Sequence, residues 1–230
     1  MKQKPERPDD RDAAAKRALS SPSLAQIRES LCDLTPKPIG KYRYYSVLIP
    51  LVERDGELNI LYEVRSDNLR HQPGEIGFPG GKIEAGETPR DCAARETCEE
   101  LCIRPNAVEL IGPLNYIVTY SDFTMYAFLG RIEADALSRA KPNPQEVKRL
   151  FEVPLRFFLE NEPDVYINEL RPSIAKDFPL DKIHFKEGYS WRTGEATVPI
   201  YTYRDAITGE EFVIWGLTAR LTQDFIQLIR

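Results

Sequence analysis

The chain has 230 residues, of which 42% are hydrophobic and 29% are charged, and its formal net charge is −5. This composition is typical of a soluble globular protein with one substantial domain. The negative charge argues against nonspecific binding to nucleic acids or anionic membranes, because both need a basic surface. No apolar stretch approaches the roughly 20 residues that a membrane span requires.

The cysteines and histidines do not form a zinc motif. The chain has 4 Cys and 2 His, no Cys-x-x-Cys pair, and no histidine near a cysteine in sequence. Reduced, structural thiols are therefore expected. Residues 1–20 lack the apolar stretch of a secretory signal and contain several acidic residues, unlike a transit peptide. We predict a cytoplasmic location.

The N-terminal part is predicted to be an extension of the folded domain. Residues 1–20 are polar and mixed in charge, which predicts a mobile tail. Residues 23–32 place leucine and isoleucine at helical spacing, which predicts a short helix. Proline and glycine break the chain over 35–40. We therefore predict an N-terminal extension over 1–38 and one domain over 39–230.

Strand patterns occupy most of this domain. Residues 44–52 are almost wholly apolar, which is typical of a central strand covered on both faces. Residues 58–65 follow an Arg-Asp-Gly turn and alternate in polarity, which predicts a second strand. Further strands are expected over 108–118, 123–131, 147–153, 201–204 and 211–215, the last two as a hairpin.

Helices are predicted near 154–160 and over 217–229, while 163–200 shows no clear pattern. The packing face of the final helix would carry Leu217, Leu221, Phe225 and Leu228. Strands before and after a central helix, followed by this closing helix, predict an α/β fold with a mixed sheet between helical layers.

The central helix is acidic. Thr88 is a suitable N-cap and Pro89 fits the first helical position. At about 100° per residue, Glu96, Glu99 and Glu100 share one face. Carboxylates at these spacings repel one another by a few tenths of a kcal/mol per pair, so the cluster predicts neutralising cations. Hard oxygen ligands select Mg²⁺ or Mn²⁺. We expect the opposite side to be buried, and it carries Ala94, Cys98 and Leu101.

A long run of residues at fixed spacings surrounds these glutamates, comprising Gly81, Glu87, Arg95, Glu96, Glu99, Glu100 and Ile103. This run resembles the Nudix box, the signature of a family that hydrolyses nucleoside diphosphates linked to another moiety. The resemblance implies a Nudix-type α/β/α sandwich, formed here as a single domain with an N-terminal extension. Two positions depart from the pattern: Thr97 replaces an aliphatic residue, and Cys102 replaces a glycine.

The resemblance also implies roles for these residues. Glu96, Glu99 and Glu100 would ligate Mg²⁺ or Mn²⁺, together with the Gly81 carbonyl. Glu87 and Arg95 would form the ion pair that fixes the loop–helix–loop, and both are included with the three glutamates among the predicted catalytic residues. If position 102 needs a left-handed backbone, cysteine costs roughly 1 kcal/mol there.

The segment before the box resembles the motif of coenzyme A diphosphatases within this family. Arg65-Ser66, Arg70, Gly74 and Phe78-Pro79-Gly80-Gly81 fall at the expected spacings, whereas the usual Leu-Leu-Thr before the arginine is here Leu61-Tyr62-Glu63. The resemblance implies substrate contacts from Arg65, Arg70 and Phe78. Arginine suits phosphate because its planar fork donates two parallel hydrogen bonds.

We therefore predict metal-dependent hydrolysis of coenzyme A or its thioesters to 4′-phosphopantetheine derivatives and adenosine 3′,5′-bisphosphate. The general base is one of the box glutamates or Glu146, which lies in a later stretch similar to the same subfamily. The alternatives are a pyrophosphatase for ADP-ribose or another dinucleotide, and a noncatalytic module that senses a nucleotide or binds a protein. A small-molecule diphosphate is the expected partner, with no nucleic acid and no membrane. The sequence leaves a homodimer open.

Overall fold

The computed structural model describes residues 22–180, 182–184 and 191–230, which form two units over 1–40 and 41–230. The described part of the first unit contains one helix, α1 (Leu24–Leu31), which confirms the helix predicted over 23–32. Ser23 caps it through a capping box with Gln26, because the Ser23 hydroxyl accepts from the Gln26 N–H. The tail predicted over 1–20 lies outside the described residues, and the predicted boundary at 38 stays a prediction.

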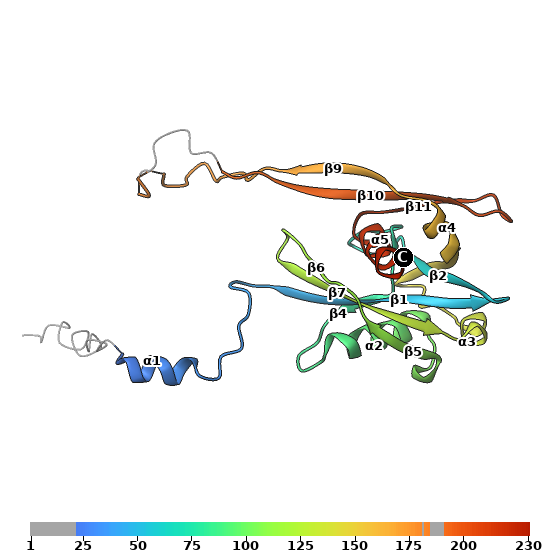
Figure 1. Cartoon of the computed structure of the whole chain (residues 1–230), viewed down its shortest axis with the longest axis horizontal. Coiled ribbons are helices and arrows are strands. Elements are labelled where there is room, and N and C mark those ends of the chain that lie inside the picture. The colour runs from blue at the N-terminus through green and yellow to red at the C-terminus, as the bar shows by residue number, and fades with distance from the viewer. Residues whose placement is uncertain (1–21, 181, 185–190) are drawn as a thin grey trace, which may run out of the picture. The chain divides into compact units, whose positions relative to one another are not determined.

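A mixed sheet forms the centre of the second unit (Figure 1). Its main path runs β3-β2-β1-β7-β5, in which β1 and β7 are parallel and the other neighbours are antiparallel. Its strands are β1 (Arg43–Arg54), β2 (Glu57–Arg65), β3 (Ile76–Gly77), β4 (Gly80–Lys82), β5 (Val108–Pro113), β6 (Ile117–Val118), β7 (Phe123–Ile132) and β8 (Val147–Pro154).

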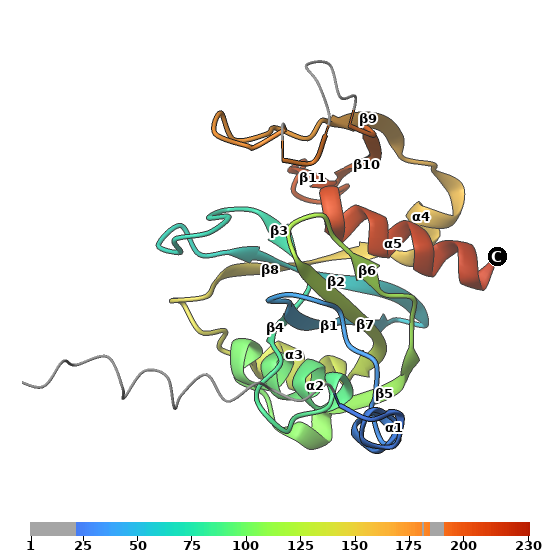
Figure 2. The ribbon, with the colours of Figure 1, turned by 90° about the vertical axis from the view of Figure 1, so that its left-hand side faces the viewer.

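Helices cover both faces of this sheet. Helix α2 (Pro89–Leu101) lies on one face and α5 (Gly216–Ile229) on the other (Figure 2). The strand sequences explain the two faces, because successive side chains point to opposite sides. On β2, Tyr62 packs in the core cluster that includes residues of α5, while Leu61 packs in the cluster that includes Leu101 of α2. This arrangement confirms the predicted α/β/α sandwich with a mixed sheet.

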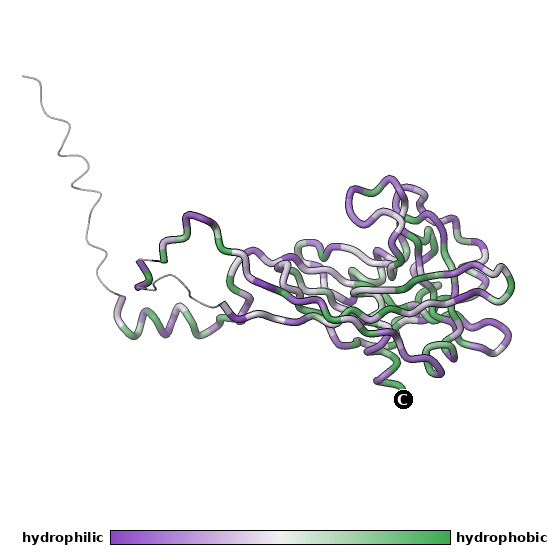
Figure 3. The backbone as a smooth tube through the Cα atoms, turned by 90° about the horizontal axis from the view of Figure 1, so that it is seen from above, coloured by the Kyte–Doolittle hydropathy of each residue, from purple (hydrophilic) through white to green (hydrophobic). Residues whose placement is uncertain are grey.

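The apolar stretches of β1 and β2 are buried. Hydrophobic segments run through the middle of the folded part of the tube, and many of its outer turns are hydrophilic (Figure 3). The remaining helices are short: η1 (Pro105–Ala107, a 3₁₀ turn), α3 (Ala134–Arg139) and α4 (Leu155–Glu160). Helix α4 confirms the helix predicted near 154–160, whereas α3 was not predicted. No helix among the described residues combines the length and the apolar character needed to cross a membrane.

A second, three-stranded sheet lies on the other side of α5 from the mixed sheet (Figure 1). It consists of β9 (Asp164–Leu170), β10 (Gly194–Arg204) and β11 (Glu211–Trp215). The predicted hairpin is confirmed by the pairing of β10 with β11. Strand β9 gave no sequence signal because most of its residues are exposed, so its apolar side chains follow no burial pattern.

Two predicted elements differ in detail. The strand expected over 108–118 divides into β5 and β6, and both of these strands pair with β7. The packing face of α5 includes Leu221 and Phe225, but Leu228 is 56% exposed near the end of the helix.

The end of α2 explains the unusual cysteine of the box. Cys102 is the C-cap and has φ 51° and ψ 46°, the left-handed conformation. Its N–H lies 3.3 Å from the Glu99 carbonyl, and the Ile103 N–H donates to the Cys98 carbonyl at 3.1 Å. The helix therefore ends in the geometry that glycine adopts most easily. Position 102 does need a left-handed backbone, the case in which cysteine was expected to be costly.

We expect Cys102→Gly to raise the free energy of unfolding by about 1 kcal/mol, because glycine removes the steric cost of Cβ in the left-handed region. Urea denaturation of both proteins measures the difference. Cys32→Ser, at an exposed position with φ −60°, is the control and should change little. A loss of stability in Cys102→Gly would contradict the assignment of strain to this position.

Candidate active site

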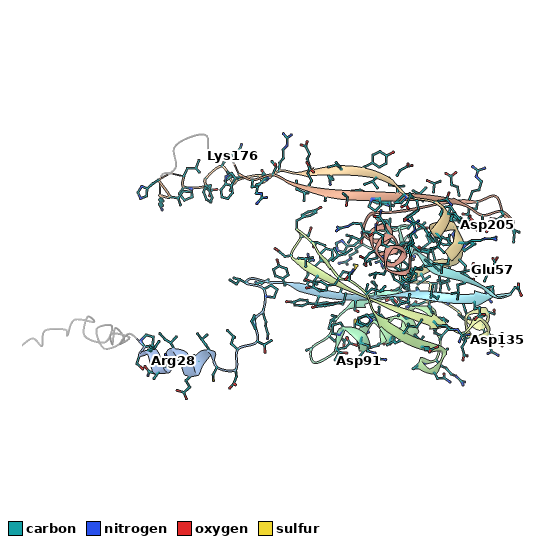
Figure 4. The ribbon with its side chains drawn as sticks, viewed as in Figure 1. Arg28, Glu57, Asp91, Asp135, Lys176 and Asp205 are labelled. Carbon is teal, nitrogen blue, oxygen red and sulfur yellow. The ribbon has the colours of Figure 1, made fainter. Side chains whose placement is uncertain are left out.

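The box is held against the edge of the sheet by backbone pairing. Strand β4 pairs with β1, so that Gly81 lies opposite Ser46 and Gly80 opposite Val47. Helix α2 then begins at Pro89 after its N-cap Thr88, whose Oγ1 accepts from the Asp91 N–H at 3.1 Å. Asp91 lies on the first turn of this helix (Figure 4), where its charge complements the positive helix end. Both predictions for the helix start are confirmed.

The ion pair between Arg95 and Glu87 is confirmed. Arg95 Nε donates to Glu87 Oε1 at 2.8 Å, and one terminal nitrogen donates to Oε2 at 3.0 Å, which makes the pair bidentate. The other terminal nitrogen lies 3.0 Å from both Glu96 Oε1 and Glu99 Oε2. One guanidinium thus joins the loop before α2 to two glutamates on the helix. Arg95 thus has acidic partners on both the loop and the helix.

The pH dependence of this ion pair follows from the pKa of Glu87. Hydrogen bonds from Arg95 and the Glu84 N–H lower that pKa from 4.5 to about 2. A lowered carboxyl pKa stabilises the fold above the unfolded-state pKa, and the contribution disappears as the pH falls through the folded-state value. We expect Glu87→Gln to destabilise the protein fully above about pH 4.5, with a difference that shrinks toward pH 2. Urea unfolding of both proteins across this range measures it, and a constant difference would contradict the prediction.

Glu96 lies directly against the backbone of Gly81. A Cβ placed on Gly81 would be 2.3 Å from both Cδ and Oε1 of Glu96, closer than real Cβ atoms approach any atom. The Glu96 side chain is 20% exposed, and burial raises its pKa, against the opposing effect of Arg95. Only glycine at position 81 leaves room for this carboxylate. The structure therefore brings together two of the predicted metal-binding groups.

Glu100 occupies the buried side of α2, which corrects the predicted helix faces. The buried residues of this helix are Cys92, Ala93, Thr97, Glu100 and Leu101, while Ala94 and Cys98 are only partly buried. Glu100 is 5% exposed, and its Oε2 accepts from the Gly80 N–H at 2.8 Å. The spacing of about 100° per residue gave correct angles between the side chains of α2. The prediction of which side is buried was wrong, because Glu100 rather than Cys98 faces the sheet. Glu99, by contrast, is 59% exposed on the Arg95 side.

Thr97, one of the two departures from the box, and Cys92 have packing roles. Thr97 is fully buried and its hydroxyl donates to the Ala93 carbonyl at 2.7 Å, so the polar group is satisfied within the helix. Cys92 is also fully buried, and burial raises the pKa of its thiol to about 12. This thiol is therefore protonated at neutral pH and acts as a small packing residue, as the sequence predicted.

Sequence reasoning missed Glu63 as part of this site. Glu63 lies on β2 and is 1% exposed. Burial, followed by repulsion from Glu63, raises the pKa of Glu100, while the Gly80 N–H opposes the shift. Burial likewise raises the pKa of Glu63, and Arg65 opposes it. The one sequence signal is that Glu63 stands where threonine is usual in the coenzyme A diphosphatase motif.

Glu146 belongs to the same electrostatic neighbourhood. It is exposed in the loop before β8, and its negative charge raises the pKa values of Glu63, Glu96 and Glu100. Its Oε2 accepts from the Asn143 side chain at 3.2 Å, and its carbonyl accepts from the Ser66 N–H at 2.8 Å. The loop is therefore fastened next to the end of β2. Its role as a general base stays a prediction.

The predicted substrate residues occupy three different environments. Arg65 ends β2 and its Nε is buried without a hydrogen-bond partner among the described residues. Arg70 is exposed in the following loop. Phe78 is 6% exposed and stacks on Tyr62, with ring centroids 4.9 Å apart. This packing position differs from the predicted substrate contact, because the ring is enclosed by the core.

The oxygen atoms of Glu96, Glu99, Glu100 and Gly81 are of the kind that binds a hard divalent cation, although they do not converge on one point. Among the described residues, no three Asp, Glu, His or Cys side chains stand together as metal ligands. Two of the glutamates have other partners: Glu99 forms an ion pair with Arg95, and Glu100 accepts a hydrogen bond from the Gly80 N–H. Oxygen donors nevertheless surround this edge, and Glu63 Oε2 is buried without a hydrogen-bond partner. Carboxylate oxygens of this kind suit Mg²⁺ or Mn²⁺.

A cavity of about 220 Å³ lies elsewhere, beside α5. It is lined by Asn115, Tyr116, Thr197, Arg220 and Asp224, among others, and by none of the predicted site residues. Asn115 donates to Asp224 across this cavity wall at 3.0 Å. The acidic cluster, rather than this cavity, contains the groups with metal-binding chemistry.

Comparison with known proteins gives a family match and several relatives. The NUDIX domain family matches residues 43–168. The peroxisomal coenzyme A diphosphatase NUDT7 of Mus musculus is 33% identical over 77% of this chain and 66% of its own length. Mitochondrial Nudix hydrolase 15 of Arabidopsis thaliana is 29% identical over 86% of this chain and 62% of its own. Nudix hydrolase 3 of Caenorhabditis elegans is 38% identical over 48% and 47%.

Among solved structures, the C. elegans Ap4A hydrolase binary complex is 17% identical, with a TM-score of 0.41 over 51% of this chain and 84% of that chain. The chain spans 66%, 62% and 47% of the three curated relatives, between about half and about two thirds of their lengths. The family match covers more than half of the chain and includes the whole acidic helix with its preceding loop. The chain therefore belongs to the Nudix hydrolase family.

Proposed function

We propose that this chain hydrolyses the diphosphate of coenzyme A or its thioesters, with Mg²⁺ or Mn²⁺ as cofactor. The products would be 4′-phosphopantetheine, or its acyl form, and adenosine 3′,5′-bisphosphate. The observation that carries the proposal is the position of Glu100 and Glu96 against the backbone of Gly80 and Gly81. Rigid backbone and buried carboxylates together hold oxygen donors where a cation would bind.

The residues of the acidic cluster would bind the cation, position the helix and accept a proton. Glu96, Glu99, Glu100 and the Gly81 carbonyl would hold the cation, which when bound neutralises phosphate charge and lowers the pKa of an attacking water. Arg95 and Glu87 keep α2 and the loop before it in register. Glu146 or a box glutamate would accept the proton of that water, provided that its oxygen reaches the water. The oxygen of that water would form a new bond to one phosphorus of the diphosphate, and the bond from this phosphorus to the bridging oxygen would break. The bridging oxygen would leave with the other phosphate, so each product carries one phosphate group.

The choice of coenzyme A rests on the segment that leads into the box. Arg65 ends β2 beside the acidic cluster with an unpartnered buried Nε, and an anionic group would supply its missing acceptor. The mouse relative is named a coenzyme A diphosphatase, and the sequence from Arg65 to Gly81 resembles that subfamily's motif. Arg70 is exposed in the same loop, where it would be available to a further phosphate of coenzyme A.

An assay across coenzyme A, ADP-ribose, NADH and dinucleoside polyphosphates tests the proposal, with Mg²⁺ and Mn²⁺ in parallel and product identification. We expect coenzyme A to have the highest kcat/KM and both named products to appear. Preference for ADP-ribose or a dinucleotide would overturn the substrate assignment. The predicted cytoplasmic location remains a separate prediction; the mouse relative is named as peroxisomal and the Arabidopsis relative as mitochondrial.

A further inference from the structure

Glu63 lies in the interior of the sheet, on the side that faces α2. Strand β2 is flanked by β3 and β8, with Gly77 and Leu150 as the partners of Glu63. Side chains two residues apart on a strand share a face. Leu61 packs with Leu101 of α2, so Glu63 points toward the same helix. Glu63 lies two residues after Leu61, nearer to the end of β2 at Arg65.

The Glu63 carboxylate is buried and lacks compensation. Its side chain is 1% exposed, and Oε2 makes no hydrogen bond within the described part of the chain. A buried carboxylate oxygen without a partner is costly, since burial removes its hydration and no hydrogen bond replaces it. An apolar side chain would fill this strand position without that cost. The glutamate therefore indicates a role that needs negative charge.

The surroundings of Glu63 point to a cation as the missing partner. The charged groups that act on it are Arg65 on its own strand, Glu100 on α2 and Glu146 in the loop before β8. Two of these three are carboxylates, so the local balance is negative. Among the described residues, the buried side-chain atoms without a partner are Glu63 Oε2 and Arg65 Nε, which belong to residues two positions apart on β2. A divalent cation with a phosphate group would supply partners of both signs.

We propose that Glu63 is a further carboxylate of the divalent-cation site, acting beside Glu100 from the sheet side. This inference rests on the proposed function, because it assumes that α2 holds the cation. It adds a strand residue to a site that the box alone places on α2 and the loop before it. The rival explanation is that Glu63 and Glu100 share a proton and hold no metal.

Binding of Mn²⁺ to the full metal-free chain, followed by electron paramagnetic resonance, distinguishes these explanations. We expect Glu63→Gln, which keeps shape and removes charge, to weaken Mn²⁺ binding roughly 10- to 100-fold. Thermal unfolding supplies the second measurement. Without metal, Glu63→Gln should be more stable than the original protein by about 2 °C or more, because repulsion with Glu100 is gone. The gain in melting temperature on adding Mn²⁺ should shrink.

Glu57→Gln is the matched control, because Glu57 starts the same strand with a 55% exposed side chain. It should leave both measurements unchanged. Unchanged Mn²⁺ affinity in Glu63→Gln would overturn the inference in favour of a shared proton, and so would an unmodified protein that binds no Mn²⁺. If Mn²⁺ binding falls as expected but coenzyme A is not cleaved by the unmodified protein, the proposed function fails and the assignment of Glu63 stands.

Discussion

Replacing Glu100 with glutamine is expected to reduce kcat for coenzyme A hydrolysis by roughly 100- to 1,000-fold, the range seen when one preorganised electrostatic group is removed. The glutamine keeps an oxygen that can accept from the Gly80 N–H, the contact that holds the carboxylate at 2.8 Å. It also removes a buried negative charge beside Glu63. The fold should therefore survive, with a melting temperature equal to or above that of the original protein in the absence of metal.

Steady-state kinetics at saturating Mg²⁺, together with thermal unfolding, check this expectation. Glu160→Gln is the control, because Glu160 is an exposed helical glutamate at the end of α4. It should retain full activity. Activity of Glu100→Gln within about threefold of the original would show that this carboxylate takes no part in the reaction, and the proposed metal site would have to be abandoned.

Gly81→Ala is expected to separate activity from stability. The added Cβ would meet the Glu96 carboxylate at 2.3 Å, and that carboxylate is the free end of a flexible side chain. The side chain can rotate away at small cost, so the fold should lose no more than about 1 kcal/mol. The displaced carboxylate can no longer bind where it did, and a misplacement of about 1 Å can cost about 100-fold in rate. Activity should therefore fall by about that factor.

Two other glycines provide controls for this result. Gly112→Ala adds a Cβ into open space and should change neither activity nor stability. Gly80→Ala would bring Cβ to 2.4 Å from the Ser46 carbonyl oxygen and 2.6 Å from Val47 Cα, where the backbone cannot rotate aside. That variant should lose stability and activity together. If Gly81→Ala instead unfolds like Gly80→Ala, the contact with Glu96 is not the reason for glycine at position 81.

The parts of the site that the sequence could predict depend on local spacing. The cap at Thr88 and the bidentate pair of Arg95 with Glu87 join residues that are at most eight positions apart. Strand alternation in β2 is also a local property, and it defines which residues share a face. The local contacts of the box are therefore made largely by residues of one continuous segment of the chain.

The parts that could not be predicted depend on how distant segments meet. A helical wheel gives angles between Glu96, Glu99 and Glu100, but only packing on β1 and β4 decides that Glu100 faces inward. Glu63 enters the site for the same reason, because it comes from a strand that precedes α2 by more than twenty residues. Phe78 shows the reverse case: a motif position next to the box turns out to stack in the core.

The contacts of Arg95 limit what can replace it. Its Nε and one terminal nitrogen are occupied by Glu87, and its other terminal nitrogen lies between Glu96 and Glu99. A lysine has the same charge but only one side-chain nitrogen. It could therefore not bind Glu87 on the loop and both Glu96 and Glu99 on the helix at the same time. At the proposed metal site, an incoming cation would compete with Arg95 for Glu96 and Glu99 and would leave the Glu87 contact intact. Arg95 would thus release two of the proposed ligands while the loop stays fastened to α2.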